Sequence, residues 1–356
     1  MSYENHIWSL TVEAEEQSCL EDRIKLLKQA INIADAHNDI DRGYNLRIML
    51  IGAEQLTNHS CESVPAFTWI LEVYDNNPDL FSAEDLLSIY RWLAYNCLNN
   101  LEITIGQADN ILEDFRRRSL SEGYSEREYY NIKLNQSLFR GDKISARKYL
   151  ELRDSCPEDE MTTEGFDLLL RIYVEIAEED FDTAIFHTNQ FVAKQPVHQI
   201  NKSAVYSGFI YHSLMTGYKA LADEYFEKAI SAFSGQDMYP YHIYEMSLLM
   251  YYMSKYRKDT AWEYFSRFVK WELEADDIYR FHFAASVLPL FSSGGICEIE
   301  GVGSGQPYYN EEHTYELTDL FNYYKGLALN LAHRFDVRNN TTDFKETVDK
   351  VLEYIK

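Results

Sequence analysis

Two helices joined by a short turn can be read from Ser203–Phe233, SAVYSGFIYHSLMTGYKALADEYFEKAISAF. Gly217 ends the first helix, and the second carries Ala222, Phe226 and Ala229 on one face, three or four residues apart. The small-residue anchor returns along the chain at spacings of 38, 38, 38 and 39 residues, at Ala108, Ala146, Ala184, Ala222 and Ala261. Self-similarity at such a fixed period predicts an all-α fold of stacked antiparallel helical hairpins.

The same unit resembles the tetratricopeptide repeat family. Three residues match the family's small, aromatic and alanine positions: Ala222, Phe226 and Ala229. In the preceding unit, Ala184 fits the anchor and Pro196 falls where the family places its closing proline. The period of about 38 departs from the family's length of about 34, and Thr188 and Arg153 stand at expected core positions. The resemblance implies a right-handed superhelix of about six to eight hairpins; a HEAT-like or other helical-hairpin array is the structural alternative.

Composition excludes several classes of protein. The 356 residues include 58 acidic and 33 basic side chains, a formal charge of −25, which disfavours binding to a nucleic-acid phosphate backbone. An apolar fraction of 46% is too high for a disordered chain. Only 15 glycines and 7 prolines are present, too few for an all-β fold with its many turns. A folded, helical protein is therefore expected.

The five cysteines are odd in number and widely spaced, and none forms a CxxC pair, which predicts a reduced, cytoplasmic protein. The N-terminus has no basic segment followed by a long apolar stretch, so neither a signal peptide nor a membrane partner is expected.

The periodicity predicts three parts of the chain. Residues 1–291 form the helical repeat solenoid, 292–310 a Gly-rich loop insertion with five glycines, and 311–356 the C-terminal capping helices, at about 316–335 and 342–355. The two possibilities for 292–310 are a plain loop and a loop that contains a short β-hairpin.

No motif predicts catalysis, a metal or a cofactor. Gly301–Gln306 lacks the Lys-Ser/Thr of a phosphate-binding loop, and a flexible loop is the plainer interpretation. The ten histidines include no HExxH pair. We therefore predict a non-enzyme, with an active site in the 292–310 loop as a third possibility.

Acidic residues concentrate between Glu151 and Asp182, where twelve carboxylates stand against two arginines, a net charge of −10. One interpretation is a solvated face that aids solubility. The other is a docking surface for a basic protein, formed by Glu158, Asp159, Glu160, Glu164, Glu178, Glu179, Asp180 and Asp182.

The resemblance also implies which residues face a concave groove: Tyr90, Asn131, Asn135, Tyr173, Tyr211, Met246 and Met250. Tyrosine and methionine suit contact with peptide segments, and Asn131 and Asn135 lie one helical turn apart, a spacing that suits a peptide backbone. The alternative is that all seven are packing residues.

These observations predict a protein-interaction scaffold without catalysis. The stretch Leu327–Asn340 resembles the tail of a group of uncharacterised bacterial repeat proteins, which implies a bacterial origin. The acidic charge favours an antagonist or immunity-type protein, as in a toxin–antitoxin pair, that neutralises a basic toxin or nuclease domain. The alternative is a regulator that senses a short peptide in its groove. We expect a monomer or weak homodimer.

Overall fold

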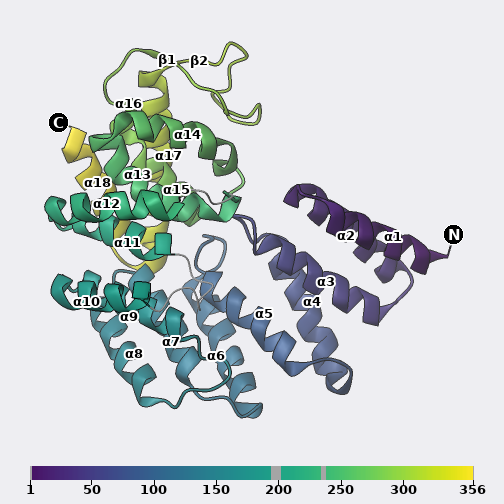
Figure 1. The fold of residues 1–356 in the computed structure, drawn as a ribbon. Coiled ribbons are helices and arrows are strands. Elements are labelled where there is room, and N and C mark those ends of the chain that lie inside the picture. The colour runs from purple at the N-terminus through teal and green to yellow at the C-terminus, as the bar shows by residue number, and fades with distance from the viewer. Residues whose placement is uncertain (1, 194–201, 234–237, 356) are drawn as a thin grey trace. The chain divides into compact units, whose positions relative to one another are not determined.

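The computed structural model describes residues 2–193, 202–233 and 238–355, so Pro196 lies outside the described residues. Nearly all the regular secondary structure of the described chain is helical, with one short antiparallel strand pair, which confirms the all-α prediction (Figure 1). It divides into two compact units. Unit 1 comprises residues 1–97 with 239–241, and unit 2 comprises residues 98–238 with 242–356.

Unit 1 is a run of helices in which each packs against the next along the chain. They are α1 (Tyr3–Glu16), α2 (Leu20–Ala36), α3 (Ile40–Glu54), α4 (Ser63–Asn76), the 3₁₀ turn η1 (Pro78–Leu80) and α5 (Ala83–Asn96). Side chains of Ser2, Asp39 and Ser82 accept hydrogen bonds from backbone N–H groups in the first turns of α1, α3 and α5, which fixes where these helices begin.

Unit 2 contains two alternating sets of helices. We call the first the inner helices: α7 (Arg127–Phe139), α9 (Glu164–Ala177), α11 (Lys202–Met215), α13 (Ile243–Tyr256) and α15 (Asp277–Ser286). The second, the outer helices, are α6 (Ile105–Ser121), α8 (Lys143–Ser155), α10 (Phe181–Ala193), α12 (Lys219–Phe233) and α14 (Lys258–Glu272). Each of α7, α9, α11 and α13 contacts both the next inner helix and the outer helix that follows it, which is the arrangement of stacked hairpins.

The anchor alanines occupy one place in this arrangement. Each is the fourth residue of an outer helix and is at most 2% exposed: Ala108, Ala146, Ala184, Ala222 and Ala261. A methyl group at this position lets the outer helix lie close to its inner partner. A larger side chain would separate the two helices.

The Gly-rich loop is joined to the fold at both ends. Strand β1 (Ile296–Glu298) pairs with β2 (Thr314–Glu316), so the hairpin reaches beyond 292–310. Within the loop, Ile299 and Val302 are buried, and the Gln306 side-chain amide donates to the Val269 carbonyl at 3.2 Å and the Glu272 carboxylate at 3.0 Å. The loop is therefore packed onto α14.

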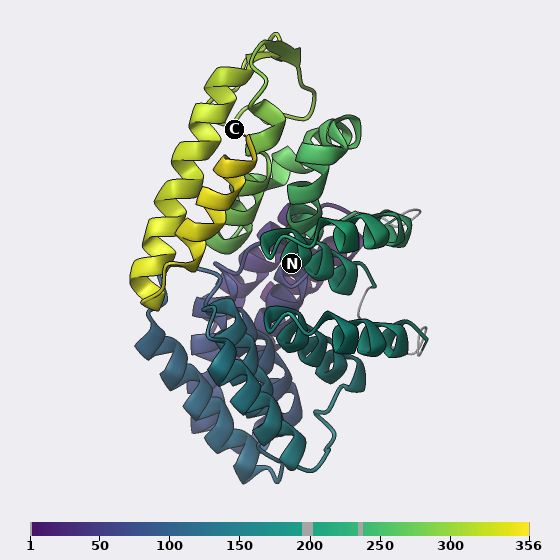
Figure 2. The same cartoon turned by 90° about the vertical axis from the view of Figure 1, so that its left-hand side faces the viewer.

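The last helices belong to the core of unit 2. Figure 2 shows α17 (Leu317–Asn339), in yellow-green, beside α18 (Asp343–Ile355), in yellow. Phe344 of α18 stacks on Phe335, and Tyr354 donates to the Leu214 carbonyl of α11 at 2.7 Å. Unit 2 thus contains residues of all three predicted parts, because the loop and the last helices share one core with the repeats. Between α15 and α17 the chain forms α16 (Leu288–Phe291).

Candidate functional site

The predicted acidic surface falls into two groups. Glu158, Asp159, Glu160 and Glu164 lie before α9 or at its first residue, whereas Glu178, Glu179, Asp180 and Asp182 lie at the turn into α10. The 14 residues of α9 separate them, a length of about 20 Å at 1.5 Å per residue. We call these the first and second acidic groups.

Nearly all of these carboxylates are exposed; Asp159 is half-buried. Asp159 accepts hydrogen bonds from the Ser125 backbone and hydroxyl, both at 2.7 Å, and Glu178 forms an ion pair with Arg147. In the ranges that the structure describes, no cation lies within ion-pair distance of Glu158, Glu160, Glu179 or Asp182. These four therefore supply uncompensated negative charge.

Two other acids of the run are buried and paired. Asp167 on α9 accepts from Arg127, at 2.8 Å and 2.5 Å, and from the Asn131 amide at 2.6 Å. Glu175 lies 2.8 Å from the His187 imidazole. The run Glu151–Asp182 is thus not one continuous charged face, because two of its carboxylates pair with other side chains between the packed helices.

Asn131, predicted to hold a peptide, belongs to this buried network. It is 1% exposed, and its carbonyl accepts from the Arg153 guanidinium at 3.2 Å. Arg153, also 1% exposed, donates to the Asp167 backbone carbonyl at 2.8 Å. The Asn131 amide therefore joins α7, α8 and α9, while Asn135, one turn further along α7, is half-buried.

Two predicted groove tyrosines lie on neighbouring inner helices. The half-buried Tyr173 of α9 donates to the Ala204 carbonyl at 2.9 Å. Its ring lies against Gly208, where a β-carbon would come within 2.7 Å of it. Tyr211 of α11 is 9% exposed, and its hydroxyl lies 3.4 Å from the Thr347 hydroxyl of α18.

Tyr211 is part of an aromatic group around His282, which we call the inner tyrosine cluster: Tyr211, Tyr244, Tyr251, Tyr279 and His282. Ring centroids lie 4.9 Å apart for Tyr211 and Tyr251, and 5.4 Å apart for Tyr244 and His282. Tyr244 and Tyr279 keep part of their surface exposed. The cluster therefore presents aromatic and hydroxyl groups from α11, α13 and α15.

Ionisable groups in and beside the cluster have shifted pKa values. Burial raises the pKa of Glu245 to about 7, although the Ser203 hydroxyl donates to its carboxylate at 2.6 Å and acts in the opposite direction. Burial also lowers the pKa of His282 to about 3 and that of His212 to about 4. The histidines are neutral at pH 7 and Glu245 is poised to ionise, a concentration of perturbed groups typical of binding sites.

The remaining predicted groove residues are buried in the core. Tyr90 of α5 is 4% exposed, Met246 is 1% exposed and Met250 is fully buried. Both methionines belong to the core cluster that the inner helices share with α14 and the C-terminal helices.

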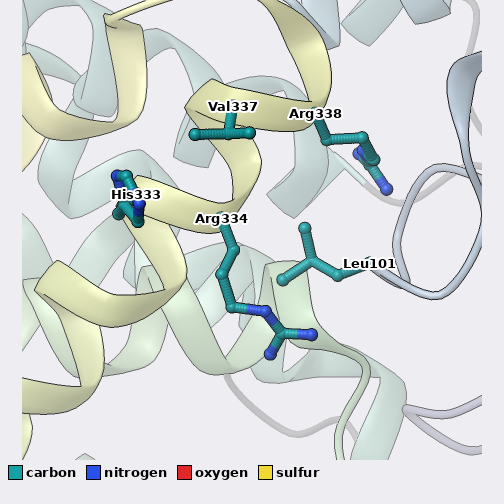
Figure 3. Close-up of a pocket in the computed structure, with 5 residues that line it drawn as sticks. All are labelled: Leu101, His333, Arg334, Val337 and Arg338. Atoms are coloured by element: carbon teal, nitrogen blue, oxygen red, sulfur yellow. The ribbon is translucent and has the colours of Figure 1, made fainter.

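A surface pocket of about 260 Å³ lies where α17 meets the loop between α5 and α6, lined by Leu101, His333, Arg334, Val337 and Arg338 (Figure 3). Arg338 extends to the loop, where it donates to the Asn100 carbonyl at 2.7 Å and the Leu98 carbonyl at 2.9 Å. The Arg338 guanidinium is engaged in these hydrogen bonds to backbone carbonyls, so among the lining residues only Arg334 offers an accessible guanidinium. We assign the pocket no function.

The fold and these surfaces define a helical repeat protein with exposed acidic loops and a tyrosine-rich set of inner helices. No protein-family model matches the chain, and no curated protein is significantly similar to it. Among the described residues, no helix combines the length and apolar character needed to span a bilayer. Tyr244, Tyr251, Tyr279 and His282 were not among the residues predicted from the sequence, and the signal for them is the high tyrosine content of α13.

Proposed function

We propose that this chain is a non-catalytic scaffold that binds a basic protein partner. More specifically, we propose a bacterial, cytoplasmic antagonist that neutralises a toxin or nuclease domain. The observation that carries the proposal is the uncompensated charge of Glu158, Glu160, Glu179 and Asp182 at the two ends of α9. Exposed charge of one sign accelerates and orients the approach of an opposite charge.

Charge reversal at both acidic groups tests this function. A variant with Glu158, Glu160, Glu179 and Asp182 replaced by lysine changes the net charge by +8. It is expected to weaken the purified complex at least about tenfold, because favourable interface pairs become repulsive. Partners are first captured from the source cells with wild-type protein, and the dissociation constant of each purified pair is then measured by calorimetry at two salt concentrations.

The matched control carries the same charge change on unit 1. The exposed acidic residues of α1 and α2 used for it are Glu13, Glu15, Glu16 and Asp22. Their replacement by lysine is expected to alter the affinity less than about threefold, because salt screens most of the interaction between distant exposed charges. If both variants lost the same amount of affinity, net charge alone would explain the effect. That result would contradict a docking surface at α9.

Peptide binding is the second candidate, favoured by the inner tyrosine cluster and the carboxyl group of Glu245 beside it. Basic peptides from a library are expected to raise the melting temperature of the chain, and more strongly above pH 7 than below it. The reason is that Glu245 gains its negative charge as pH rises through about 7.

Glu245→Gln should remove this pH dependence, and Glu274→Gln, a change at an exposed glutamate, should leave it intact. Thermal denaturation followed by circular dichroism gives the readout. If no peptide raises the melting temperature at either pH, the peptide-sensing function is dropped.

A further inference from the structure

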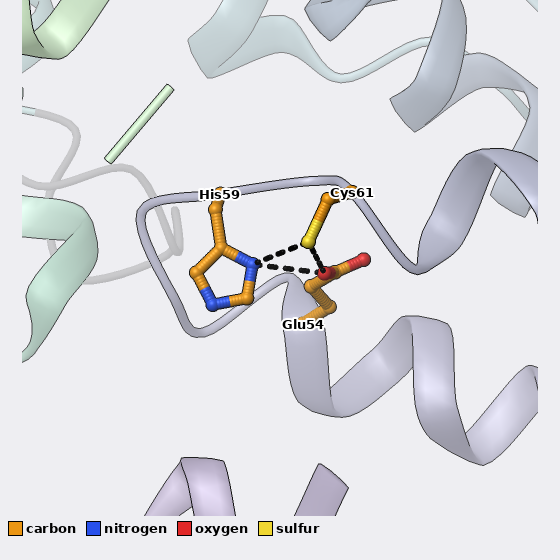
Figure 4. A group of neighbouring side chains, drawn as sticks. All are labelled: Glu54, His59 and Cys61. Atoms are coloured by element: carbon orange, nitrogen blue, oxygen red, sulfur yellow. Dashed lines mark hydrogen bonds and ion pairs between the residues drawn. The ribbon is translucent and has the colours of Figure 1, made fainter. Parts of the chain in front are cut away.

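Three side chains of different chemistry meet after α3 in unit 1. The Glu54 carboxylate oxygen Oε1 lies 2.9 Å from His59 Nδ1 and 3.6 Å from Cys61 Sγ, and the same Nδ1 lies 3.6 Å from Sγ. Figure 4 shows the three atoms as the corners of a triangle. Glu54 is the last residue of α3, and the other two lie on the loop to α4. We call this group the α3–α4 triad.

The loop holds the triad in place through its own hydrogen bonds. Glu54 accepts from the Glu62 backbone N–H at 3.0 Å through Oε1, and from the Ser63 N–H at 2.6 Å and the Ser63 hydroxyl through Oε2. The Thr57 hydroxyl donates to the Glu54 carbonyl at 2.7 Å. The carboxylate is fully buried, the His59 side chain is 15% exposed, and Cys61 is exposed. The triad thus combines one buried, hydrogen-bonded carboxylate, that of Glu54, with two side chains that solvent reaches, those of His59 and Cys61.

The triangle has the dimensions of one face of a zinc tetrahedron. Bond lengths of about 2.3 Å to sulfur and about 2.0–2.1 Å to nitrogen and oxygen place tetrahedral donor atoms about 3.5 Å apart for S···N and S···O, and about 3.3 Å apart for N···O. Both sulfur distances already agree, and the 2.9 Å N···O contact needs to open by only about 0.4 Å. Hydrogen bonds to the far carboxylate oxygen are the outer-shell support that metal ligands require.

We propose that Glu54 Oε1, His59 Nδ1 and Cys61 Sγ form a three-ligand site for Zn²⁺, with water as the fourth ligand on the exposed side. Binding replaces the proton on Nδ1 and the proton on the thiol, so two protons leave for each Zn²⁺ bound. The occupied site then holds a dipositive ion, a carboxylate, a thiolate and a neutral imidazole, which sum to zero charge. The affinity therefore rises with pH.

The competing state is a protonated His59 held by Glu54. Burial lowers the pKa of His59, but its interactions with Cys61 and Glu54 act in the opposite direction and raise it to about 10. Zinc must displace this proton, so the binding experiment belongs at mildly alkaline rather than acidic pH. Cobalt(II) reports on the same site, because thiolate coordination gives a near-ultraviolet charge-transfer band and tetrahedral geometry gives strong visible bands.

The test titrates the tag-free, full-length chain with Co²⁺, and then with Zn²⁺ against a chromophoric chelator. One equivalent of Co²⁺ is expected to give the thiolate band, and Zn²⁺ to displace it. Cys61→Ser and His59→Gln should each weaken Zn²⁺ binding at least about 100-fold, since loss of an outer-shell partner alone typically costs 10–100-fold. Ser63→Ala, which removes one such partner, should weaken binding about tenfold.

Cys19→Ser is the matched control, because Cys19 is also exposed and its thiol also contacts a carboxylate, that of Glu21 at 3.0 Å. It should bind Zn²⁺ as the wild type does. Circular dichroism checks that the Cys61 and His59 variants remain helical. Absence of the thiolate band, wild-type affinity in Cys61→Ser, or an equal loss in Cys19→Ser would each overturn the proposal.

Discussion

Replacing Asp167 with alanine is expected to destabilise unit 2 by about 3–5 kcal/mol, the usual loss when one partner of a buried ion pair is removed. Asp167 is the acceptor shared by Arg127 and Asn131, and its side chain is 8% exposed. Without it, Arg127 keeps only the carbonyl groups of Arg153 and Cys156, at 3.2 Å and 3.1 Å. A guanidinium whose side chain is only 11% exposed then loses the carboxylate that balances its charge.

Urea denaturation followed by circular dichroism measures this loss. Glu178→Ala is the matched control, since it removes an acid that pairs with Arg147 nearer the surface, where such pairs are worth about 0–1 kcal/mol. A further variant, with Asp167, Arg127 and Arg153 all replaced by apolar residues of similar size, should recover much of the stability. If Asp167→Ala costs no more than Glu178→Ala, the network does not hold α7, α8 and α9 together.

The outer helices were the most predictable part of the fold. Few side chains other than alanine fit where two helices approach closely, so the buried fourth position of each outer helix can be recognised in the sequence. Ala146 and Ala222, for example, are both fully buried. The two C-terminal helices were also predicted within a few residues. Their periodicity is strong, and Thr341 and Thr342 mark the turn between them.

Other boundaries depend on local chemistry that periodicity does not report. Residues Asp277–Phe291 form two helices, α15 and α16, and not one, because Pro289 lacks the backbone N–H that a continuous helix would require there. A short β-hairpin wholly within 292–310 was one of the two possibilities for this loop, and strand β1 does form there. Its partner is Thr314–Glu316, and a pairing across this distance has no local sequence signal.

The candidate sites were predictable only in part, because residue type does not reveal the partner of a side chain. Asn131 reads as a peptide-binding amide, yet its hydrogen bonds go to Asp167 and Arg153 inside the hairpins. The α3–α4 triad escaped the zinc patterns because its ligands follow neither CxxC nor HExxH spacing. Its available signal was a histidine two residues before a cysteine, shortly after the end of a helix.

The Gly-rich loop provides the second large prediction, at Gly301. This residue has a φ of +86°, and a β-carbon there would lie 2.1 Å from the backbone carbonyl oxygen of Ser266 in α14. Gly301→Ala therefore combines left-handed backbone strain with a clash that no side-chain rotation relieves. Strain of this kind costs about 1–3 kcal/mol by itself, and with the clash we expect a loss of about 3 kcal/mol.

Gly303→Ala is the control within the same loop, because a β-carbon at Gly303 would meet no atom within 4 Å and the φ of this residue is outside the left-handed range. It should change the free energy of unfolding by less than about 0.5 kcal/mol. Limited proteolysis adds a local readout: detachment of the loop would expose Ile299 and Val302, which are now buried, and cleavage should accelerate in Gly301→Ala alone. Equal stability and equal cleavage in the two variants would mean that the loop does not need its contact with α14.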